Sequence, residues 1–397
     1  MKAGTRLSKV KYAIRDVMLA AKQVEASGKK VLKLNLGDPN AYDFDVPPYV
    51  KKALVTALDS GKSGYCDSQG DLALRNAVVK QNSRRGFDSS ADEVMVCSGL
   101  SEGLSMLYGA AMERHENVLI PSPTYPMYES LAHYYEFEPR FYSCDESNGW
   151  QPDVDDLRKK MDEHTRFVIV INPNNPTGAL YDEKVLKEII NLAGEFGVPV
   201  VSDEIYDELY FGKKPVSMGK LAGDVPCIVM NGLSKNYFAP GWRIGWMTFL
   251  NCSQSPLFEA VNQVSRIRLC SSSVGQAAAA HALENEGEYA KFLPAQLAKL
   301  KPRRDLAFKR LNEINGLSCV KPEGAFYAFP RIESGPWVDD KEFCLDLLKE
   351  KGVLTVFGSG FAEAQGSKHF RIVFLPPEDV LNPAFDAIEE FMKEKGA

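Results

Sequence analysis

The run GLSKNYFAPGWRIGW (residues 232–246) contains more chemical information than any other part of the chain. It places Lys235 directly after Ser234, and Arg243 follows eight positions later. Proteins use the amine of a lysine in a pocket as a base or as a nucleophile toward carbonyl groups. A single lysine proves little, because most lysines are solvated surface charges. The case for Lys235 therefore rests on what the rest of the chain places beside it.

Apolar, strand-like runs alternate with helical segments through the middle of the chain. The expected strands are residues 93–97, 117–120, 167–171, 198–201, 227–230 and 243–250, and the expected helices are 101–113, 127–135 and 182–196. This alternation predicts right-handed crossovers and an α/β fold with a mostly parallel sheet covered by helices. Ligands of such sheets bind beyond the carboxyl ends of the strands. Polar clusters follow five of the strands, at Cys97, Ile120, Ile171, Val201 and Met230, which predicts one shared active site.

The two ends of the chain differ from the middle. Residues 1–45 predict one amphipathic helix, an extended stretch and a turn at DPN. The C-terminal part predicts helices over about 287–315, 339–349 and 383–395, and strands at 325–329, 353–357 (VLTVF) and 370–375 (FRIVFL). We therefore expect a large domain over residues 46–285, a smaller α+β domain over 286–397, and an N-terminal segment, 1–45, that packs with the smaller domain.

Composition excludes several kinds of function. Of the 397 residues, 45% are hydrophobic and 25% are charged, as is usual for a globular protein. A net charge of −6 argues against nucleic acid or an anionic membrane as the main partner. The cysteines are scattered and form no CxxC pair, so we expect neither a zinc nor an iron–sulfur site. The chain begins with a basic amphipathic segment that lacks an apolar signal region, and no apolar run is long enough to span a membrane. Reduced thiols in the cytoplasm are the simplest expectation.

The run CSGLS (residues 97–101) joins an expected strand to an expected helix through a glycine. Exposed N–H groups at the start of a helix attract anions. Because the chain has neither G-x-G-x-x-G nor a Walker lysine motif, a dinucleotide or a nucleoside triphosphate is disfavoured. The hydroxyl of Ser234 and the guanidinium of Arg243 would complete a site for a single phosphate group. The alternative is an ordinary strand–helix turn in which Ser101 caps the helix.

Asp203 follows the apolar run VPVVS. A carboxylate at the end of a buried strand either caps a neighbouring helix or faces a cationic group. The protonated nitrogen of a pyridoxal cofactor is one such group. Tyr206, three residues later, either reaches the same pocket or is a core tyrosine with a satisfied hydroxyl.

Three further residues have both a chemical and a structural interpretation. Asn175 lies in a loop stiffened by two prolines, which either orients its amide or is simply a turn. Tyr125, in PSPTYP, would stack on a flat ring or pack in the core. Arg371, in FRIVFL, is either a charge at a sheet edge or a bidentate clamp for a carboxylate.

Together these segments resemble the fold-type-I pyridoxal-phosphate aminotransferases of classes I and II. The motifs that carry the resemblance follow one another between residues 34 and 375: LNLGDPN, GYCDSQG, SGLSEGL, PSPTYP, NPNNPTG, SDEIY, GLSKNYFAPGWRIGW, PEGAFY and FRIVFL. A single fragment of this kind occurs by chance, whereas the ordered series covers nearly the whole chain.

The resemblance implies pyridoxal 5′-phosphate as the cofactor and a role for each candidate residue. Lys235 is similar to the lysine that forms a Schiff base, and Asp203 to the carboxylate that pairs with the ring nitrogen. The other cofactor contacts that it implies are Tyr206 and Asn175 on the ring hydroxyl oxygen, Tyr125 on the ring face, and Gly99, Leu100, Ser101, Ser234 and Arg243 on the phosphate. Tyr65 would reach the phosphate in the partner subunit, so the active unit would be a homodimer. Arg371, with Asn175 and the Gly37 backbone beside it, would hold the α-carboxylate of the substrate.

Within the family, KVLKLNLGDPN, GYCDSQG and CDESNGWQPDVDDLR are most similar to bacterial and archaeal alanine (glutamate–pyruvate) aminotransferases. The implied reaction converts L-alanine and 2-oxoglutarate to pyruvate and L-glutamate. Arg15, in the segment that often covers the site in this family, would meet the second carboxylate of glutamate or would lie on the surface. The alternatives are an aminotransferase of aromatic, aspartate or broad specificity, a lyase of the same fold, and a non-catalytic pyridoxal-binding sensor.

Overall fold

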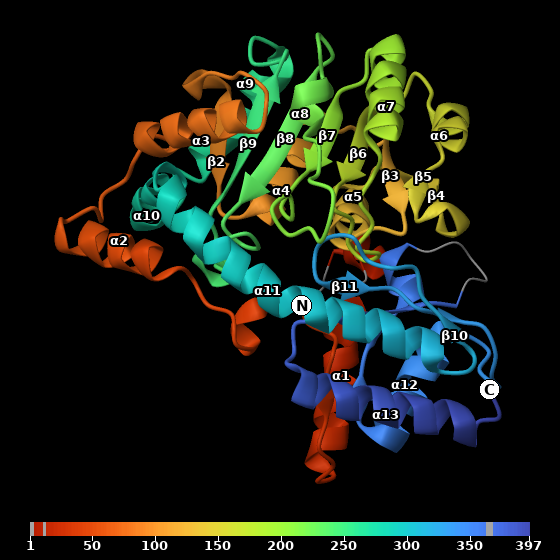
Figure 1. Ribbon diagram of the computed structural model, residues 1–397. Helices are drawn as coiled ribbons and strands as arrows, with labels where there is room; N and C mark the ends of the chain where they lie inside the picture. The colour runs from red at the N-terminus through yellow and green to blue at the C-terminus, as the bar shows by residue number, and fades with distance from the viewer. Residues whose placement is uncertain (1–3, 11–12, 363–367) are drawn as a thin grey trace.

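The computed structural model of the protein describes residues 4–10, 13–362 and 368–397. Its largest element is a sheet of eight strands in the order β2-β9-β8-β7-β6-β3-β4-β5 (Figure 1). The strands are β2 (Val94–Cys97), β9 (Gly245–Leu250), β8 (Cys227–Gly232), β7 (Val200–Asp203), β6 (Thr165–Ile171), β3 (Asn117–Ser122), β4 (Glu138–Asp145) and β5 (Gln151–Pro152). Strands β8, β7, β6, β3 and β4 pair in parallel, whereas β9 is antiparallel to β2 and β8, and β5 is antiparallel to β4. The expected mostly parallel sheet is confirmed.

Helices cover both faces of this sheet, which explains why its strands are continuously apolar. Successive residues of β6 point to opposite faces. Ile169 joins the apolar cluster of Leu104 and Tyr128, from α4 (Leu100–Ala111) and α5 (Met127–Tyr135). Val168 joins the cluster of Ile189, from α7 (Glu183–Phe196). The other helices of this part are α2 (Pro48–Asp59), α3 (Leu72–Arg84), α6 (Val154–Lys160), α8 (Met218–Leu221), α9 (Pro256–Ile267) and α10 (Ser273–Glu284).

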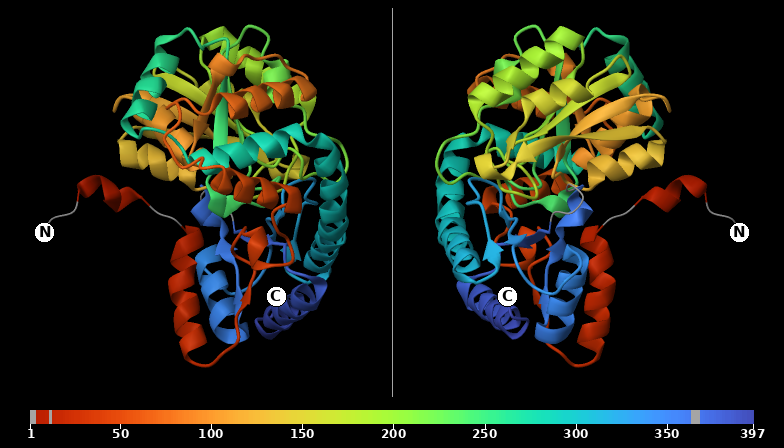
Figure 2. Two further views of the ribbon diagram at one scale, coloured as in Figure 1. Left: turned by 90° about the vertical axis from the view of Figure 1, so that its left-hand side faces the viewer. Right: turned by 90° about the vertical axis from the view of Figure 1, so that its right-hand side faces the viewer.

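The remaining elements gather below the large sheet in the view of Figure 1. They are the helices α1 (Ala13–Ala26), α11 (Glu286–Glu313), α12 (Asp340–Lys351) and α13 (Glu378–Glu394), and the short strands β1 (Leu32–Lys33), β10 (Leu317–Ser318), β11 (Tyr327–Ala328), β12 (Arg331–Ile332), β13 (Val353–Leu354), β14 (Val356–Phe357) and β15 (Phe370–Val373). Strand β1 pairs with β13, so the N-terminal segment joins elements from the end of the chain. The short 3-10 helix η1 (Thr5–Lys9) extends to one side of the body (Figure 2).

Two expectations for the C-terminal part are wrong in detail. The run VLTVF does not form one strand: β13 pairs with β1, and β14 pairs with β15. The last helix begins at Glu378 rather than near Pro383, and Pro383 lies inside it. The acidic residues Glu378 and Asp379 stabilise the actual first turn through the helix dipole.

The carboxyl ends of the central parallel strands meet at one edge of the large sheet. Ile171 of β6 lies opposite Asp203 of β7, and Asp203 lies opposite Met230 of β8. This register brings the loops that follow the three strands to a common level. The loop with Asn175, the carboxylate of Asp203 and the turn with Lys235 therefore start side by side.

No helix in the described part of the chain is long and apolar enough to cross a lipid bilayer. The eight cysteines are free thiols, and most of them are buried. Among the described residues, no group of three or more histidine, cysteine and acidic side chains is arranged to hold a metal ion.

Candidate active site

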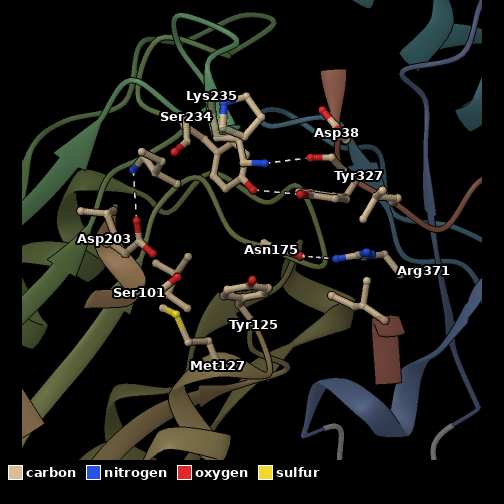
Figure 3. Close-up of a pocket in the computed structure, with 18 of the residues that line it drawn as sticks. Asp38, Ser101, Tyr125, Met127, Asn175, Asp203, Ser234, Lys235, Tyr327 and Arg371 are labelled. Carbon is tan, nitrogen blue, oxygen red and sulfur yellow. Dashed lines mark hydrogen bonds between the residues drawn. The ribbon is translucent and has the colours of Figure 1, made fainter. Parts of the chain in front are cut away.

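A pocket of about 490 Å³ lies where the large sheet meets the elements from the two ends of the chain. Most of the residues that the sequence singles out line it: Arg15, Gly37, Leu100, Ser101, Tyr125, Asn175, Asp203, Tyr206, Ser234, Lys235, Arg243 and Arg371. Figure 3 shows Lys235, Asp203, Tyr125 and Arg371 arranged around this shared space.

Lys235 lies in the turn between β8 and β9, and its side chain reaches across to the N-terminal segment. Its Nζ donates a hydrogen bond to the carbonyl oxygen of Gly37 at 2.8 Å and lies 5.3 Å from the centre of the Phe326 ring. Burial lowers the pKa of Lys235 to about 8, and the carboxylate of Asp38 opposes this shift. A substantial fraction of the amine is therefore neutral, and hence nucleophilic, near physiological pH.

Asp203, the last residue of β7, is buried and lines the pocket. Its Oδ2 accepts a hydrogen bond from the hydroxyl of Tyr128 at 2.7 Å, and its Oδ1 accepts one from the N–H of Ile205 at 3.2 Å. Burial raises the pKa of Asp203 to about 6, while both hydrogen bonds favour the ionised form. A cationic group in the pocket would stabilise the carboxylate further.

The N-terminus of α4 and the guanidinium of Arg243 form a corner suited to an anion. Gly99, the residue that caps the helix, has φ +77°, and a Cβ atom there would lie 2.4 Å from Nη2 of Arg243. Glycine is therefore required for both its backbone conformation and the close approach of the guanidinium. Leu100, Ser101 and Ser234 line the same pocket. In proteins, phosphate groups accept hydrogen bonds from helix N–H groups, hydroxyls and guanidinium groups.

Arg371 is a buried residue and not an edge charge. Its Nη1 donates to Oδ1 of Asn175 at 3.0 Å, and its Nη2 donates to the carbonyl oxygen of Asn35 at 2.7 Å. The guanidinium also lies over two aromatic rings, with its carbon 4.6 Å from the centre of the Tyr327 ring and 4.7 Å from that of Phe361. These contacts fix the plane of the guanidinium, and Arg371 also lines the pocket. Bidentate binding of a carboxylate requires a guanidinium held in this way.

Three tyrosines line the pocket: Tyr125, Tyr206 and Tyr327. The hydroxyl of Tyr206 lies 2.9 Å from that of Tyr327. Burial, followed by the neighbouring Tyr327, raises the pKa of Tyr206 well above its ordinary value, so the phenol stays neutral. The half-buried ring of Tyr125 borders the open space of the pocket (Figure 3).

Two predicted residues differ from the rest in placement. Tyr65 is 83% exposed and does not line this pocket within a single chain. Arg15 reaches the pocket from α1, although its side chain is largely exposed.

The sequence motifs did not single out three further residues in or beside the site. Asp38 and Tyr327 lie in the quoted motifs LNLGDPN and PEGAFY, but only the fold brings them beside Lys235 and Tyr206. Tyr128 is an aromatic residue on the buried face of α5, where a core tyrosine is the ordinary expectation. No pattern along the chain distinguishes it from an ordinary core residue.

Comparison with known proteins supports the fold and the family that the sequence motifs predict. Residues 29–388 match the family described as aminotransferase class I and II. An alanine aminotransferase of Mycobacterium tuberculosis is 38% identical over 398 residues, covering 98% of this chain and 92% of the relative. A glutamate-pyruvate aminotransferase of Escherichia coli is 35% identical over 396 residues, covering 98% and 97%. The solved structure of an alanine aminotransferase from Pyrococcus furiosus superposes with a TM-score of 0.96 at 48% identity, covering 99% of this chain and 100% of that one. The expected fold is thus confirmed, and the chain belongs to the class I and II aminotransferase family.

Proposed function

We propose that this aminotransferase uses pyridoxal 5′-phosphate to exchange the amino group between L-alanine and 2-oxoglutarate, which yields pyruvate and L-glutamate. The observation that carries the proposal is the convergence, in one pocket, of the Lys235 amine, the buried Asp203 carboxylate and the anion corner at the start of α4. A lysine, an acid and a phosphate site are the three groups that a pyridoxal cofactor needs from a protein.

The residues of the pocket fit this cofactor. When bound, pyridoxal 5′-phosphate condenses with primary amines and accepts the electron pair left at the α-carbon of an amino acid. Asp203 would pair with the ring nitrogen, and Tyr206 and Asn175 would hold the ring hydroxyl oxygen. The ring of Tyr125 would cover one face. Gly99, Leu100, Ser101, Ser234 and Arg243 would hold the phosphate.

The chain's own groups supply orientation and proton transfer. Arg371 would fix the α-carboxylate of the substrate, with the backbone of Gly37 and the amide of Asn175 beside it. This restraint would hold the α-carbon bond that breaks perpendicular to the ring plane. The Lys235 amine has a pKa of about 8, so it accepts and releases protons near neutral pH and is suited to act as the base at the α-carbon.

The walls of the pocket support a small amino acid and a dicarboxylic partner. Ile14 and Leu36 add apolar surface suited to the methyl group of alanine. Arg15, from the same helix as Ile14, would meet the second carboxylate of glutamate or 2-oxoglutarate. The names of the relatives from M. tuberculosis, E. coli and P. furiosus agree with this substrate pair.

We also propose a homodimer in which Tyr65 completes the partner's phosphate site. Tyr65, Ile267 and Leu269 are exposed large side chains. Their segments lie side by side, because Ser273 Oγ donates to the carbonyl oxygen of Gly64 at 2.5 Å. A second copy would cover this apolar face.

We further propose the domain division 1–45, 46–285 and 286–397. We also propose a cytoplasmic location, which suits eight unpaired thiols.

A panel of amino donors against pyruvate and 2-oxoglutarate tests the proposal. We expect equimolar transfer from alanine to 2-oxoglutarate, measured by mass spectrometry, and the best kcat/KM for this pair. We expect Lys235→Ala to lose both turnover and the visible absorbance of the bound cofactor. Keto-acid-independent release of ammonia would instead identify a lyase, and full activity of Lys235→Ala would refute the mechanism.

A further inference from the structure

We propose that Tyr327 is a positioning residue that acts on two parts of the site at once: its hydroxyl orients and polarises Tyr206, and its ring fixes Arg371. This inference rests on the proposed function, because it assigns Tyr327 a task toward the groups that hold the cofactor and the substrate carboxylate.

The strand register places Tyr327 against Arg371. Strand β11 pairs antiparallel with β15, and Tyr327 lies opposite Val373. Residues opposite each other share a face of the sheet, and so do residues two apart on one strand. Tyr327 and Arg371 are therefore diagonal neighbours on one face, and the guanidinium carbon lies 4.6 Å from the centre of the tyrosine ring.

The hydroxyl of Tyr327 reaches the opposite side of the pocket. It lies 2.9 Å from the hydroxyl of Tyr206. It also lies directly against the backbone of Gly37, where an added Cβ atom would be 2.3 Å from it. The carbonyl oxygen of Gly37 accepts the hydrogen bond of Lys235. One buried side chain thus connects the surroundings of Arg371, Tyr206 and Lys235.

The direction of the Tyr206–Tyr327 hydrogen bond follows from counting protons. Each neutral phenol has one proton to donate. If Tyr206 donates its proton to the ring oxygen of the cofactor, only Tyr327 remains to donate within the pair. A hydrogen bond accepted by the Tyr206 oxygen strengthens the one that Tyr206 donates. Tyr327 would therefore help Tyr206 to hold negative charge on the ring oxygen.

The two tasks of Tyr327 are separable by substitution. Tyr327→Phe keeps the ring against Arg371 and removes the hydroxyl, whereas Tyr327→Leu removes both. Tyr142→Phe is the matched control: this buried hydroxyl donates to the carbonyl oxygen of Ile169, outside the pocket. Its loss costs one buried hydrogen bond without touching the site.

The first measurement is the pH titration of the visible absorption band of the bound cofactor. With the cofactor bound, the titrating proton would be shared between its ring oxygen and the nitrogen of Lys235. Hydrogen-bond donors to the ring oxygen favour loss of this proton, so removing a donor raises the pH at the midpoint of the titration. We expect Tyr327→Phe to raise the midpoint by about half a pH unit, the size of a partial hydrogen-bond loss. Tyr142→Phe should leave it unchanged, and adding Tyr327→Phe to Tyr206→Phe should produce no further rise.

The second measurement separates the ring from the hydroxyl. The dissociation constant of a non-reactive carboxylate analogue should stay within about twofold in Tyr327→Phe and rise about tenfold in Tyr327→Leu, the size of a lost cation–π contact. An unmoved midpoint in Tyr327→Phe, or an equal shift in the Tyr206→Phe background, would overturn the role of the hydroxyl. Equal affinity in Tyr327→Leu would overturn that of the ring. If the wild-type protein develops no visible band with pyridoxal 5′-phosphate, the proposed function itself fails, and the inference with it.

Discussion

The hydroxyl of Tyr128, on α5, donates a hydrogen bond to Oδ2 of Asp203, on β7, at 2.7 Å. Both side chains are buried, and the hydrogen bond opposes the effect of burial on the pKa of Asp203. The carboxylate can therefore face the pocket in its ionised form, which a positively charged ring nitrogen requires as a partner. The ionised form of Asp203 is therefore stabilised by Tyr128, a buried residue that does not itself line the pocket.

Tyr128→Phe tests this dependence. Without the hydroxyl, the pKa of Asp203 should rise further, and a larger fraction of the carboxyl should be protonated at neutral pH. We expect about tenfold weaker binding of pyridoxal 5′-phosphate at pH 7, the size of a hydrogen bond to a charged group. The deficit should shrink toward pH 9, where Asp203 is ionised in both proteins. Fluorescence titration of the cofactor-free proteins measures it, and a deficit independent of pH would contradict the explanation.

The pKa of Lys235 predicts how fast the cofactor-free protein takes up the cofactor. Burial lowers this pKa to about 8, so the amine loses its proton as the pH rises through that value. Only the neutral amine has a free electron pair for attack on an aldehyde. We expect the rate at which the visible band appears to rise with pH and to reach half its maximum near pH 8.

Asp38→Asn is the companion variant for this titration. The carboxylate of Asp38 raises the pKa of Lys235, so its removal should move the half-maximum to lower pH. Stopped-flow absorbance at several pH values measures both proteins. A half-maximum above that of the wild type would show that Asp38 does not stabilise the ammonium form.

We expect the loss of activity on removal of Arg371 to persist when only its positive charge is restored. Arg371→Ala should lower kcat/KM for alanine by roughly a hundredfold or more, as expected for removing one partner of a desolvated ion pair. Arg371→Lys keeps the charge but not the two-pronged geometry, so it should recover only a small part of the loss. Steady-state kinetics with both substrates measures the effect. An unchanged kcat/KM in Arg371→Ala would remove this residue from the site.

The proposed role of Tyr65 in the partner's phosphate site predicts complementation between Lys235→Ala and Tyr65→Ala. In a dimer of Lys235→Ala with Tyr65→Ala, one site would combine an intact Lys235 with an intact Tyr65 from the other subunit. Co-expression should restore roughly a quarter of the wild-type specific activity, because about half of the dimers are hybrids with one intact site each. Activity no greater than the sum of the separate variants would contradict a shared site.

Much of the fold and site was predictable because local patterns report local structure. The apolar run FVIVI predicts a buried strand, and β6 (Thr165–Ile171) contains it. Polar residues at strand ends predicted that Asn175, Asp203 and Lys235 would share one pocket, and the parallel register of β6, β7 and β8 explains why they do. The run VLTVF shows the limit: its two halves pair with strands that lie far away in the sequence.

The sequence by itself determined the fold class, the family and the residue types of the site, because apolar periodicity and ordered motifs are properties of short segments. Only the tertiary structure decided the chemistry that these residues can perform. Desolvation by residues from distant segments lowers the pKa of Lys235 and raises that of Asp203, and the aromatic rings of Tyr327 and Phe361 fix the plane of Arg371. Burial, hydrogen-bond direction and the distance between charges exist only once the chain has folded, so no pattern along the chain contains them.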